Sequence, residues 1–247
     1  GRHSGRMRHL LESAEGVIAN SQDTLDQLCQ FATSQSLPPP KQKIVALLGT
    51  EAQQIAATSA DCPARPYFVV IGTIEARKNH LLLLKIWQRL VAAWGEKAPT
   101  LLLIGQRGWE IDEVAQILDR DLSLQGHVIE LGRCSDSQMA GLLAGARALL
   151  MPSFAEGFGI PVIEALQSGT PVIASDLGVF REVAGDIPLY LSPDDPAAWT
   201  QAILSYSAGS EDRRRQVSLI ANYAAPNWED HFRRVDSWLE GISQNSR

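Results

Sequence analysis

Four short apolar runs, each followed directly by glycine or proline, restrict the folds open to this chain of 247 residues. A continuous apolar run of four or five residues is typical of a strand that is buried on both faces of a parallel sheet. A glycine directly after such a strand lets the backbone approach a ligand closely. The runs are residues 67–71 before Gly72, 100–104 before Gly105, 128–131 before Gly132 and 148–151 before Pro152.

Helix-like segments separate these runs. In residues 81–94 the apolar side chains recur at the spacing of a helix with one buried face. Strands that alternate with helices in this way predict an α/β fold with a doubly wound, Rossmann-like parallel sheet. Ligands bind such sheets at the carboxyl ends of the strands. Further helices are expected at 111–122, 136–146 (capped by Ser135), 161–167 and 197–206, and further strands at 171–174 and 188–191.

The two ends of the chain differ from this pattern. Residues 1–50 predict a helix, a strand at 16–20, a helix at 23–31 capped by Ser21, and a strand at 44–48. From 51 to 66 the composition turns to Ala, Thr, Gln and Pro, which is typical of a linker. The expected organisation is therefore a remnant of one domain (1–50), a linker (51–66), a main domain (67–226) and an amphipathic terminal helix that packs back toward the first domain (227–247).

Charge and cysteine usage limit the possible partners. A formal net charge of −6 argues against general nucleic-acid binding, which needs a basic surface. Cys29, Cys62 and Cys134 match no metal or redox spacing, and three isolated cysteines suggest a reducing compartment. The sequence has no apolar run near the roughly 18 residues of a membrane span, and its start lacks a signal-peptide pattern. We therefore expect a cytoplasmic protein.

Residues 155–161 form a glycine loop between a predicted strand and a predicted helix. Pro161 suits the first helical position and Gly169 the C-terminal cap. The loop would thus lie at a helix N-terminus, where backbone N–H groups attract phosphate or sugar oxygens. Glu156 precedes this helix and Glu164 lies about one turn into it, so the two carboxylates can flank one pocket.

Two alternatives compete with a sugar or phosphate site here. The segment could be a tight turn with solvated acids, since a glycine loop alone is a weak signal. It could also be a dinucleotide-binding loop, because Asp176 ends the next strand at about the distance of a ribose-binding acid. Against that alternative, Val162 stands in the place of the third glycine of the dinucleotide motif, and Glu156 would repel a pyrophosphate.

A second loop, directly after the strand 67–71, carries the adjacent cations Arg77 and Lys78. The planar guanidinium of Arg77 beside the compact ammonium group of Lys78 suits a diphosphate. Taken alone, however, such a pair is more often part of a basic loop in solvent. Both loops follow strands of one predicted parallel sheet and therefore fall on one edge. Together they predict a site with a diphosphate end and a polyhydroxyl end.

Residues 67–200 closely resemble the C-terminal domain of the family-4 glycosyltransferases (glycosyl transferases group 1), which have the GT-B fold. The resemblance rests on the run Ile71-Gly-Thr-Ile-Glu-Ala-Arg-Lys-Asn79, on Leu131-Gly132, and on residues 152–174. The last stretch contains the family's E-x7-E signature, as Glu156 and Glu164, and a following Gly-Thr-Pro-Val-Ile. The first run is most similar to that of bacterial mannosyltransferases.

The resemblance implies a role for each matching residue. Glu164 would bind the ribose hydroxyls. Lys78, with Arg77 beside it, would hold the diphosphate, and Glu156 would lie by the transferred sugar and the reacting centre. Many members have an arginine where this chain has Thr73, so Arg77 would carry more of the load or the grip on the diphosphate would be weaker. Backbone groups would supply the rest: the amides of Gly157, Phe158, Gly159 and Ile160 toward sugar hydroxyls and the distal phosphate, and Gly132, Arg133 and Cys134 beside the base.

The implied activity is retaining transfer of a hexose such as mannose from a nucleotide sugar to a glycan or lipid-linked acceptor, as in polysaccharide or lipopolysaccharide biosynthesis. GDP-linked donors are favoured over UDP-linked ones, and no other cofactor is implied. No metal is required, because cations stabilise the departing diphosphate. Asp194-Asp195 superficially suggests a metal clamp, but it lies in a Ser-Pro-Asp-Asp-Pro turn and is expected to begin a helix.

A complete enzyme of this type has two Rossmann-like domains with the active site between them, and residues 1–50 resemble only the end of the first. We therefore expect a fragment that holds the donor but is inactive alone. Peripheral association with the inner face of the membrane would come through the missing N-terminal domain. Two alternatives stay open: a non-catalytic interaction module of the same fold, against which the presence of both Glu156 and Glu164 argues, and a sugar phosphorylase or synthase that uses the same pocket.

Overall fold

The computed structural model describes residues 2–51 and 62–245. Most of the expected linker, 51–66, lies outside this part of the chain. Two compact units are formed, a smaller one from Gly1–Glu51 with Ala225–Arg247 and a larger one from Ala52–Ala224. No helix in the described ranges combines the length and the apolar composition that crossing a bilayer requires.

The larger unit is built on a parallel sheet with the strand order β5-β4-β3-β6-β7-β8. Each neighbouring pair in this sheet is parallel, which confirms the predicted α/β class. Chain order runs from β3 to β5 in one direction and then from β6 to β8 in the other. The switch point therefore lies between β3 and β6, where ligands bind in such folds. The strands are β3 (Tyr67–Ile71), β4 (Thr100–Ile104), β5 (Val128–Glu130), β6 (Leu149–Met151), β7 (Val172–Ser175) and β8 (Leu189–Leu191).

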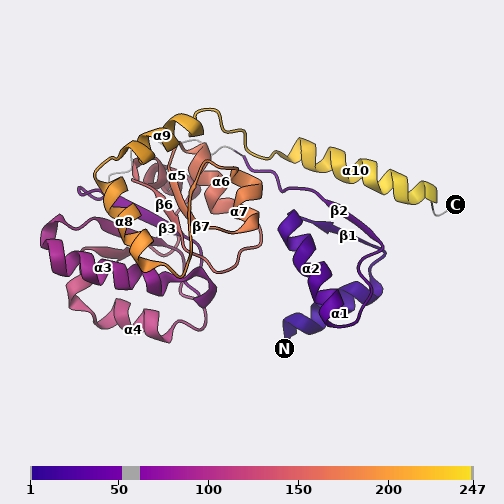
Figure 1. Cartoon of the computed structure of the whole chain (residues 1–247), viewed down its shortest axis with the longest axis horizontal. Helices are drawn as coiled ribbons and strands as arrows, with labels where there is room; N and C mark the ends of the chain where they lie inside the picture. The colour runs from indigo at the N-terminus through magenta and orange to yellow at the C-terminus, as the bar shows by residue number, and fades with distance from the viewer. Residues whose placement is uncertain (1, 52–61, 246–247) are drawn as a thin grey trace. The chain divides into compact units, whose positions relative to one another are not determined.

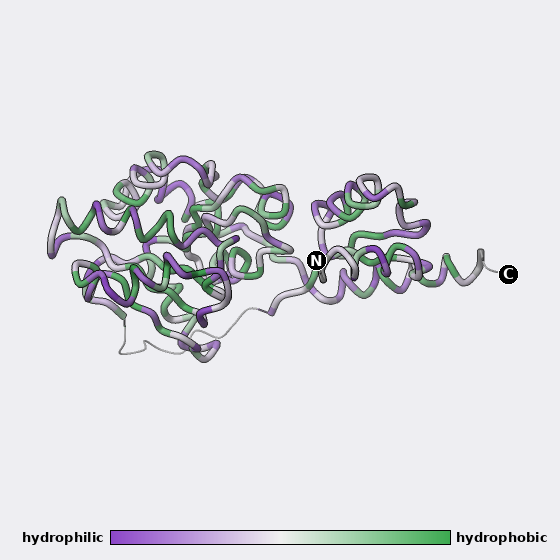
Figure 2. Tube along the Cα trace, turned by 90° about the horizontal axis from the view of Figure 1, so that it is seen from below, coloured by the Kyte–Doolittle hydropathy of each residue, from purple (hydrophilic) through white to green (hydrophobic). Residues whose placement is uncertain are grey.

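Helices cover both faces of this sheet (Figure 1). Three of them, α3, α4 and α8, lie on one face, and α5, α6 and α7 lie on the other. Hydrophobic and hydrophilic positions alternate along the helices in Figure 2, as in helices that bury one side. The helices are α3 (His80–Trp94), α4 (Asp112–Arg120), α5 (Asp136–Gly145), α6 (Ile160–Gln167), α7 (Gly178–Ala184), α8 (Pro196–Ser207) and α9 (Glu211–Ile220), with 3-10 turns at Ala76–Lys78, Gly95–Lys97 and Leu122–Leu124.

The central strands are buried on both faces, as continuous apolar runs predict. Every residue of β3, β4, β6 and β7 is buried. Trp87 of α3 is fully buried and packs edge-to-face on Phe68 of β3, with 6.0 Å between the ring centroids. Its Nε1 donates to the Pro99 carbonyl at 2.8 Å. This large ring, with its N–H satisfied, fixes α3 on the sheet.

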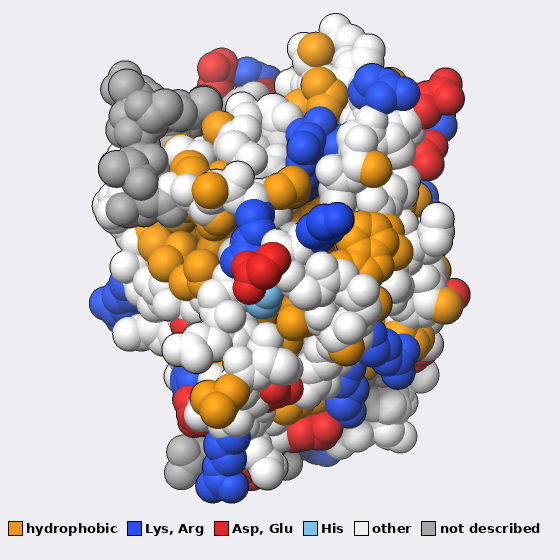
Figure 3. All heavy atoms as spheres, turned by 90° about the vertical axis from the view of Figure 1, so that its left-hand side faces the viewer, with side chains coloured by type: hydrophobic (Ala, Val, Ile, Leu, Met, Phe, Trp, Pro, Cys, Tyr) orange, Lys and Arg blue, Asp and Glu red, His pale blue; other side chains and the backbone are white. Residues whose placement is uncertain are grey.

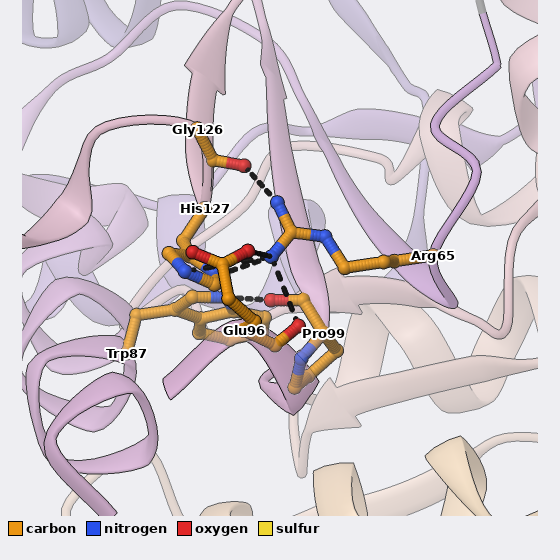
Figure 4. A network of polar contacts seen from close by, with 6 residues as sticks. All are labelled: Arg65, Trp87, Glu96, Pro99, Gly126 and His127. Atoms are coloured by element: carbon orange, nitrogen blue, oxygen red, sulfur yellow. Dashed lines mark hydrogen bonds and ion pairs between the residues drawn. The ribbon is translucent and has the colours of Figure 1, made fainter. Parts of the chain in front are cut away.

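A polar network lies beside Trp87 at the amino-terminal edge of the sheet (Figure 4). Arg65 donates from Nη2 to the Gly126 carbonyl at 2.6 Å and from Nη1 to the Glu96 carbonyl at 3.2 Å. Nη1 also lies 3.1 Å from Nδ1 of His127, which can accept only when the imidazole is neutral. Burial and the charge of Arg65 both lower the pKa of His127 and so favour this neutral form. The network ties the segment before β3 to the turns before β4 and β5.

The smaller unit holds a parallel pair of strands joined through a helix that Ser21 caps, as predicted. Its last helix, α10, packs on this sheet. The ring of Trp238 lies against Gly16, where an added Cβ would come within 2.7 Å of it. Nδ1 of His231 is 3.0 Å from the Leu47 carbonyl oxygen. The elements are α1 (Arg2–Ser13), β1 (Gly16–Ala19), α2 (Gln22–Ser34), β2 (Gln42–Val45) and α10 (Trp228–Asn245).

Several predicted boundaries differ from the structure by one to three residues, and two of these differences have a clear physical reason. The strand expected at 44–48 lies at Gln42–Val45, because after Ala46 the chain turns away and Gly49 packs against Trp228. The helix expected at 161–167 begins one residue earlier. Pro161 therefore occupies its second position, where a missing N–H is equally harmless.

The helix α9 has no counterpart in the sequence prediction. Its composition is polar, so it lacks the apolar period by which helices are recognised. A buried side chain fixes it instead: Gln216 accepts from the Val172 N–H at 2.5 Å and donates to the Val172 carbonyl at 3.0 Å. The helix is thus attached to β7 by a glutamine that completes the hydrogen bonds of the strand.

Figure 3 shows one face of the molecule, on which Lys and Arg side chains are interspersed with Asp and Glu. Ion pairs of this kind occur on the larger unit, such as Lys85 with Glu113 at 2.9 Å and Arg107 with both Asp119 and Glu130. Exposed pairs contribute only about 0–1 kcal/mol each. On the face that is drawn, the charge is mixed rather than basic.

Replacing Trp87 by phenylalanine tests how much the core depends on this ring. The substitution removes the Nε1 donor, leaves the buried Pro99 carbonyl without its partner and opens a small cavity. We expect the free energy of unfolding to fall by about 2–3 kcal/mol. Trp94→Phe on the same helix is the control, because Trp94 is 49% exposed, and it should change stability by less than about 0.5 kcal/mol. Urea denaturation followed by circular dichroism measures both free energies of unfolding. Equal losses of stability in the two variants would contradict the role of the Trp87 ring in the core.

Candidate functional site

The loops that follow β3 and β6 lie side by side at the carboxyl edge of the sheet, because these strands are neighbours. The Phe154 N–H donates to the Arg77 carbonyl at 2.8 Å and joins the two loops through their backbones. Residues that are nearly 80 positions apart in the sequence therefore form one cluster at the switch point. This is the edge on which the sequence predicts a ligand site.

Glu156 is the centre of this cluster. Its side chain is 8% exposed. Oε1 accepts from Lys78 Nζ and from Ser153 Oγ, both at 2.8 Å, and Oε2 accepts from Arg77 Nη1 at 2.8 Å. Burial alone would raise the pKa of Glu156, but the charge of Lys78 and the hydrogen bonds from these three donors lower it below the usual range. Glu156 is therefore held as a buried carboxylate with both oxygens occupied.

The backbone places Lys78 against Glu156. Lys78 ends a single 3-10 turn, and Asn79 follows in the left-handed conformation (φ 55°), with its Nδ2 bonded to the Pro193 carbonyl at 3.1 Å. The lysine stem then crosses Gly72. A Cβ at Gly72 would lie 2.9 Å from Lys78 Cε and Nζ, and the φ of Gly72 is +122°. The glycine after β3 thus makes room for a lysine of the site itself.

Arg77 connects two carboxylates. Nη2 lies 2.6 Å from Glu75 Oε1, and Nη1 contacts both Glu156 and, at 2.8 Å, the Ala155 carbonyl oxygen. Burial would lower the pKa of Arg77, but the hydrogen bonds and charges of Glu156 and Glu75 outweigh it and raise the pKa. Glu75 itself is 5% exposed. The sequence prediction gave Glu75 no role, although it stands within the motif, because a pattern does not show which acid is buried.

His80, which begins α3, is a further residue of this region that the prediction missed, besides Glu75 and Ser153. The side chain is 2% exposed, and neither ring nitrogen has a hydrogen-bond partner in the described part of the chain. Burial and the charge of Lys78 lower its pKa to about 4, so the ring is neutral at physiological pH. An uncharged ring here adds no positive charge next to Lys78.

The glycine loop places backbone donors at the start of α6. Gly159 is the N-cap with φ +93°, and a Cβ there would lie 2.9 Å from the Phe180 ring, so this position requires glycine. Phe158 is buried and Ile160 is 43% exposed. In the described part of the chain, no acceptor is assigned to the N–H groups of Phe158 and Gly159. The N–H groups of Phe158 and Gly159 therefore lie at the positive end of a helix dipole.

Glu164 lies away from this cluster, between α5 and α6. It lines a narrow cavity with Met139, Ala140 and Leu143 of α5, and Glu156 is not part of that lining. Burial, and then the charge of Asp136 at the start of α5, raise the pKa of Glu164 to about 7. Ser168 Oγ donates to the backbone carbonyl of Glu164 at 2.8 Å, and among the described residues no ion pair or hydrogen bond is assigned to the Glu164 carboxylate. The structure thus offers two carboxylates in opposite states, one paired and ionised and one unpaired and easily protonated.

The other predicted site residues lie on neighbouring loops of the same edge. Thr73 is exposed, directly after Gly72. After β5, Gly132 adopts φ +54°, and Arg133 donates to the Gln106 side chain at 3.3 Å. Cys134 is a free, half-buried thiol whose pKa is raised by burial.

Two acids that suggested other chemistry have structural partners. Asp176, the ribose acid of the dinucleotide alternative, pairs with Arg181 at 2.6 Å. Asp195 caps α8, since its Oδ1 accepts from the N–H groups of Ala197 and Ala198 at 3.1 and 3.0 Å. The expectation that Asp194-Asp195 begins a helix is confirmed.

Residues 65–208 match the family model described as glycosyl transferases group 1. The chain belongs to this family. Similar proteins include the O-antigen chain mannosyltransferase B of Escherichia coli, which is 36% identical over 167 residues (66% of this chain and 43% of that protein). The serotype-specific mannosyltransferase WbdA of Escherichia coli is 37% identical over 173 residues, which are 70% of this chain and 20% of WbdA. The chain thus spans less than half the length of the named relatives that it matches.

Solved structures share the fold of this group 1 chain. WaaG, a glycosyltransferase involved in lipopolysaccharide biosynthesis, superposes with a TM-score of 0.69 at 15% identity and covers 89% of this chain and 61% of its own. Sucrose-phosphate synthase from Thermosynechococcus elongatus gives a TM-score of 0.70 at 22% identity and covers 99% and 62%. At these identities the likeness shows the fold alone, and it confirms the fold class that the sequence predicts.

The elevated pKa of Glu164 predicts a pH-dependent stability. Because its folded pKa of about 7 lies above that of an exposed glutamate, the folded chain binds more protons than the unfolded chain at intermediate pH. The stability that Glu164 contributes is complete below the unfolded pKa and is lost as pH rises through about 7. Thermal unfolding of wild type and Glu164→Gln between about pH 5 and 8 measures this difference, since glutamine does not titrate.

We expect the stability of wild type relative to Glu164→Gln to fall as pH rises over this range. Asp136→Asn removes a neighbouring negative charge and should make the fall shallower. A difference that is constant across the range would show that Glu164 titrates like an exposed acid.

Proposed function

We propose that this site binds a nucleotide sugar and serves a retaining glycosyltransferase that moves a hexose, such as mannose, to a glycan or lipid-linked acceptor. The observation that carries the proposal is the pairing of Glu156 with Lys78 and Arg77 at the switch point of the sheet. It occurs in a chain that belongs to glycosyl transferases group 1. Cations, an ionised carboxylate and helix N–H groups on one edge suit a ligand with a diphosphate and a sugar.

Each group has donors or acceptors to offer such a ligand. An ammonium group has three donors, and the structure assigns one of those of Lys78, to Glu156. The remaining donors can reach phosphate oxygens without breaking that pair. The amides at the start of α6 add donors for the distal phosphate or for sugar hydroxyls. Glu164, when ionised, can accept hydrogen bonds from two ribose hydroxyls.

The chemistry of Glu156 follows from its environment. A carboxylate whose pKa is depressed by two cations does not act as a general acid at neutral pH. It suits the stabilisation of positive charge at the reacting carbon and the holding of sugar hydroxyls. Negative charge that develops on the departing diphosphate is stabilised by the positive charge of the loop after β3, so we propose a reaction that requires no metal.

The donor and acceptor are proposed from the relatives. Both named relatives are mannosyltransferases, and one of them is an O-antigen chain mannosyltransferase, which favours a mannose donor. We propose that this mannose is linked to GDP rather than to UDP. The acceptor proposed is a growing surface glycan or its lipid-linked form. A cytoplasmic location, with peripheral association at the inner face of the membrane, fits such an acceptor.

Titration calorimetry with GDP, UDP and ADP tests the donor site. We expect at least one of them to bind, and Lys78→Gln and Glu164→Gln each to weaken that binding by roughly tenfold or more, because each removes a charged hydrogen-bond partner. Lys85→Gln is the matched control, since this lysine is half exposed and paired with Glu113 away from the site. Its affinity should stay within about twofold of wild type. If none of the three nucleotides binds at millimolar concentration, the donor-site proposal is wrong.

A further inference from the structure

Glu75 is a buried carboxylate that the roles assigned so far leave unexplained. It precedes the 3-10 turn of Lys78 at the N-cap position, yet its side chain makes no cap hydrogen bond. Among the described residues, its one assigned side-chain partner is Arg77, at 2.6 Å. A carboxylate that is 5% exposed needs a strong partner to offset the loss of its hydration. Arg77 supplies it, although its own side chain is 45% exposed.

The guanidinium of Arg77 has two ends that do different things. Nη2 is directed to Glu75, and Nη1 is directed to Glu156 and to the Ala155 carbonyl. This planar fork is rigid, so a carboxylate that fixes one nitrogen also fixes the direction of the other. A half-exposed arginine without such an anchor would sample many rotamers. Glu75 thus sets the position of a group that contacts both Glu156 and the backbone before it.

The two cations of the site are held to different degrees. Arg77 makes contacts to two carboxylates and one carbonyl, whereas Lys78 has one assigned contact, to Glu156. An incoming diphosphate can share Lys78 with Glu156. Arg77 keeps unassigned donors, but turning its guanidinium onto a diphosphate would withdraw it from Glu75 and leave that buried carboxylate unpaired. The two adjacent cations are therefore not equivalent.

We propose that Glu75 is a positioning residue that holds the Arg77 guanidinium on Glu156 and on the 155–156 backbone, which leaves Lys78 as the cation for the donor diphosphate. The last part of this statement rests on the proposed function, while the positioning of Glu156 does not. Arg77 and Lys78 therefore have different roles in this arrangement, whereas the sequence analysis assigns both to the diphosphate.

The pKa of Glu156 in Glu75→Gln tests the proposal, because a positioning role and a purely electrostatic role of Glu75 change this pKa in opposite directions. Glu75, Arg77, Lys78 and Glu156 carry two negative and two positive charges. If Glu75 acted only through its charge, Glu75→Gln would leave more net positive charge near Glu156 and lower the pKa of Glu156 further. If Glu75 positions Arg77, the same change releases the guanidinium from Glu156 and raises that pKa.

The first experiment follows the Glu156 carboxyl by carbon-13 NMR across a pH titration of the full chain, with Glu156→Gln to assign the signal. We expect the pKa of Glu156 to rise in Glu75→Gln and in Arg77→Lys, since lysine keeps the charge but cannot bridge two carboxylates. Glu113→Gln, which removes an exposed carboxylate paired with Lys85, is the control and should leave the signal unchanged. A fall in Glu75→Gln, or no change, overturns the positioning role whether or not the chain binds a nucleotide.

The second experiment compares calorimetric affinities for GDP and GDP-mannose. In Glu75→Gln we expect the GDP affinity to stay within about threefold of wild type, because Lys78 is untouched, and the GDP-mannose affinity to fall roughly tenfold, because Glu156 is displaced. The double variant Glu75→Gln/Arg77→Gln should lose no more than Arg77→Gln alone. Equal losses for both ligands, or additive losses in the double variant, overturn the division of the two cations.

Folding of each variant is checked by circular dichroism before either measurement. If Glu75→Gln fails to fold, Arg77→Lys tests the same contact. This substitution changes the more exposed partner of the pair and leaves the buried glutamate in place. Failure of wild type to bind any of GDP, UDP and ADP would reject the proposed function, while the NMR titration would still decide whether Glu75 positions Glu156.

Discussion

The parallel pairing of β3 with β6 is the constraint on which the site depends. Their register partners, Val69 and Leu149, are 80 positions apart in the sequence, and the sheet alone makes them neighbours. Their pairing places the lysine and arginine that follow β3 beside the glutamate that follows β6. It also lets one backbone hydrogen bond, from Phe154 to Arg77, lock the two loops together. The chemistry of the cluster is a consequence of strand order.

In the site that this pairing creates, burial and the neighbouring charges together set the protonation state of each carboxylate. Glu156 is deep enough that its charge would be costly, and two cations and a hydroxyl keep it ionised. Glu164 is buried without cations and faces another acid, so its pKa moves in the opposite direction. The family signature names both residues identically, yet the two positions have contrasting electrostatics. Glu164 is easily protonated until a ligand arrives, whereas Glu156 stays charged throughout. The two carboxylates can therefore serve different ends of the same donor.

Much of this could be predicted from the sequence, and the gaps have physical reasons. The apolar runs at 67–71 and 100–104 predicted both ends of β3 and β4 correctly. This was possible because strands that are buried on both faces consist mainly of apolar residues, so the ends of the run mark the strand ends. The convergence of Arg77, Lys78 and Glu156 followed from the rule that parallel strands end on one edge. Glu75 and His80 could not be assigned, because their burial depends on packing between loops rather than on local spacing. For α9 the attachment is one glutamine, which no periodicity reveals.

The smaller unit is assembled from both ends of the chain, since α10 packs against strands formed by the first fifty residues. During synthesis, the larger unit can complete its sheet as soon as residue 224 has left the ribosome. The smaller unit also needs α10, whose Trp238 lies against Gly16 and whose His231 meets Leu47. More than 180 residues lie between β2 and α10. At translation rates of roughly 5–20 residues per second, this helix follows β2 by on the order of ten seconds or more. The larger unit is therefore complete before the helix that packs on β1 and β2 has been made.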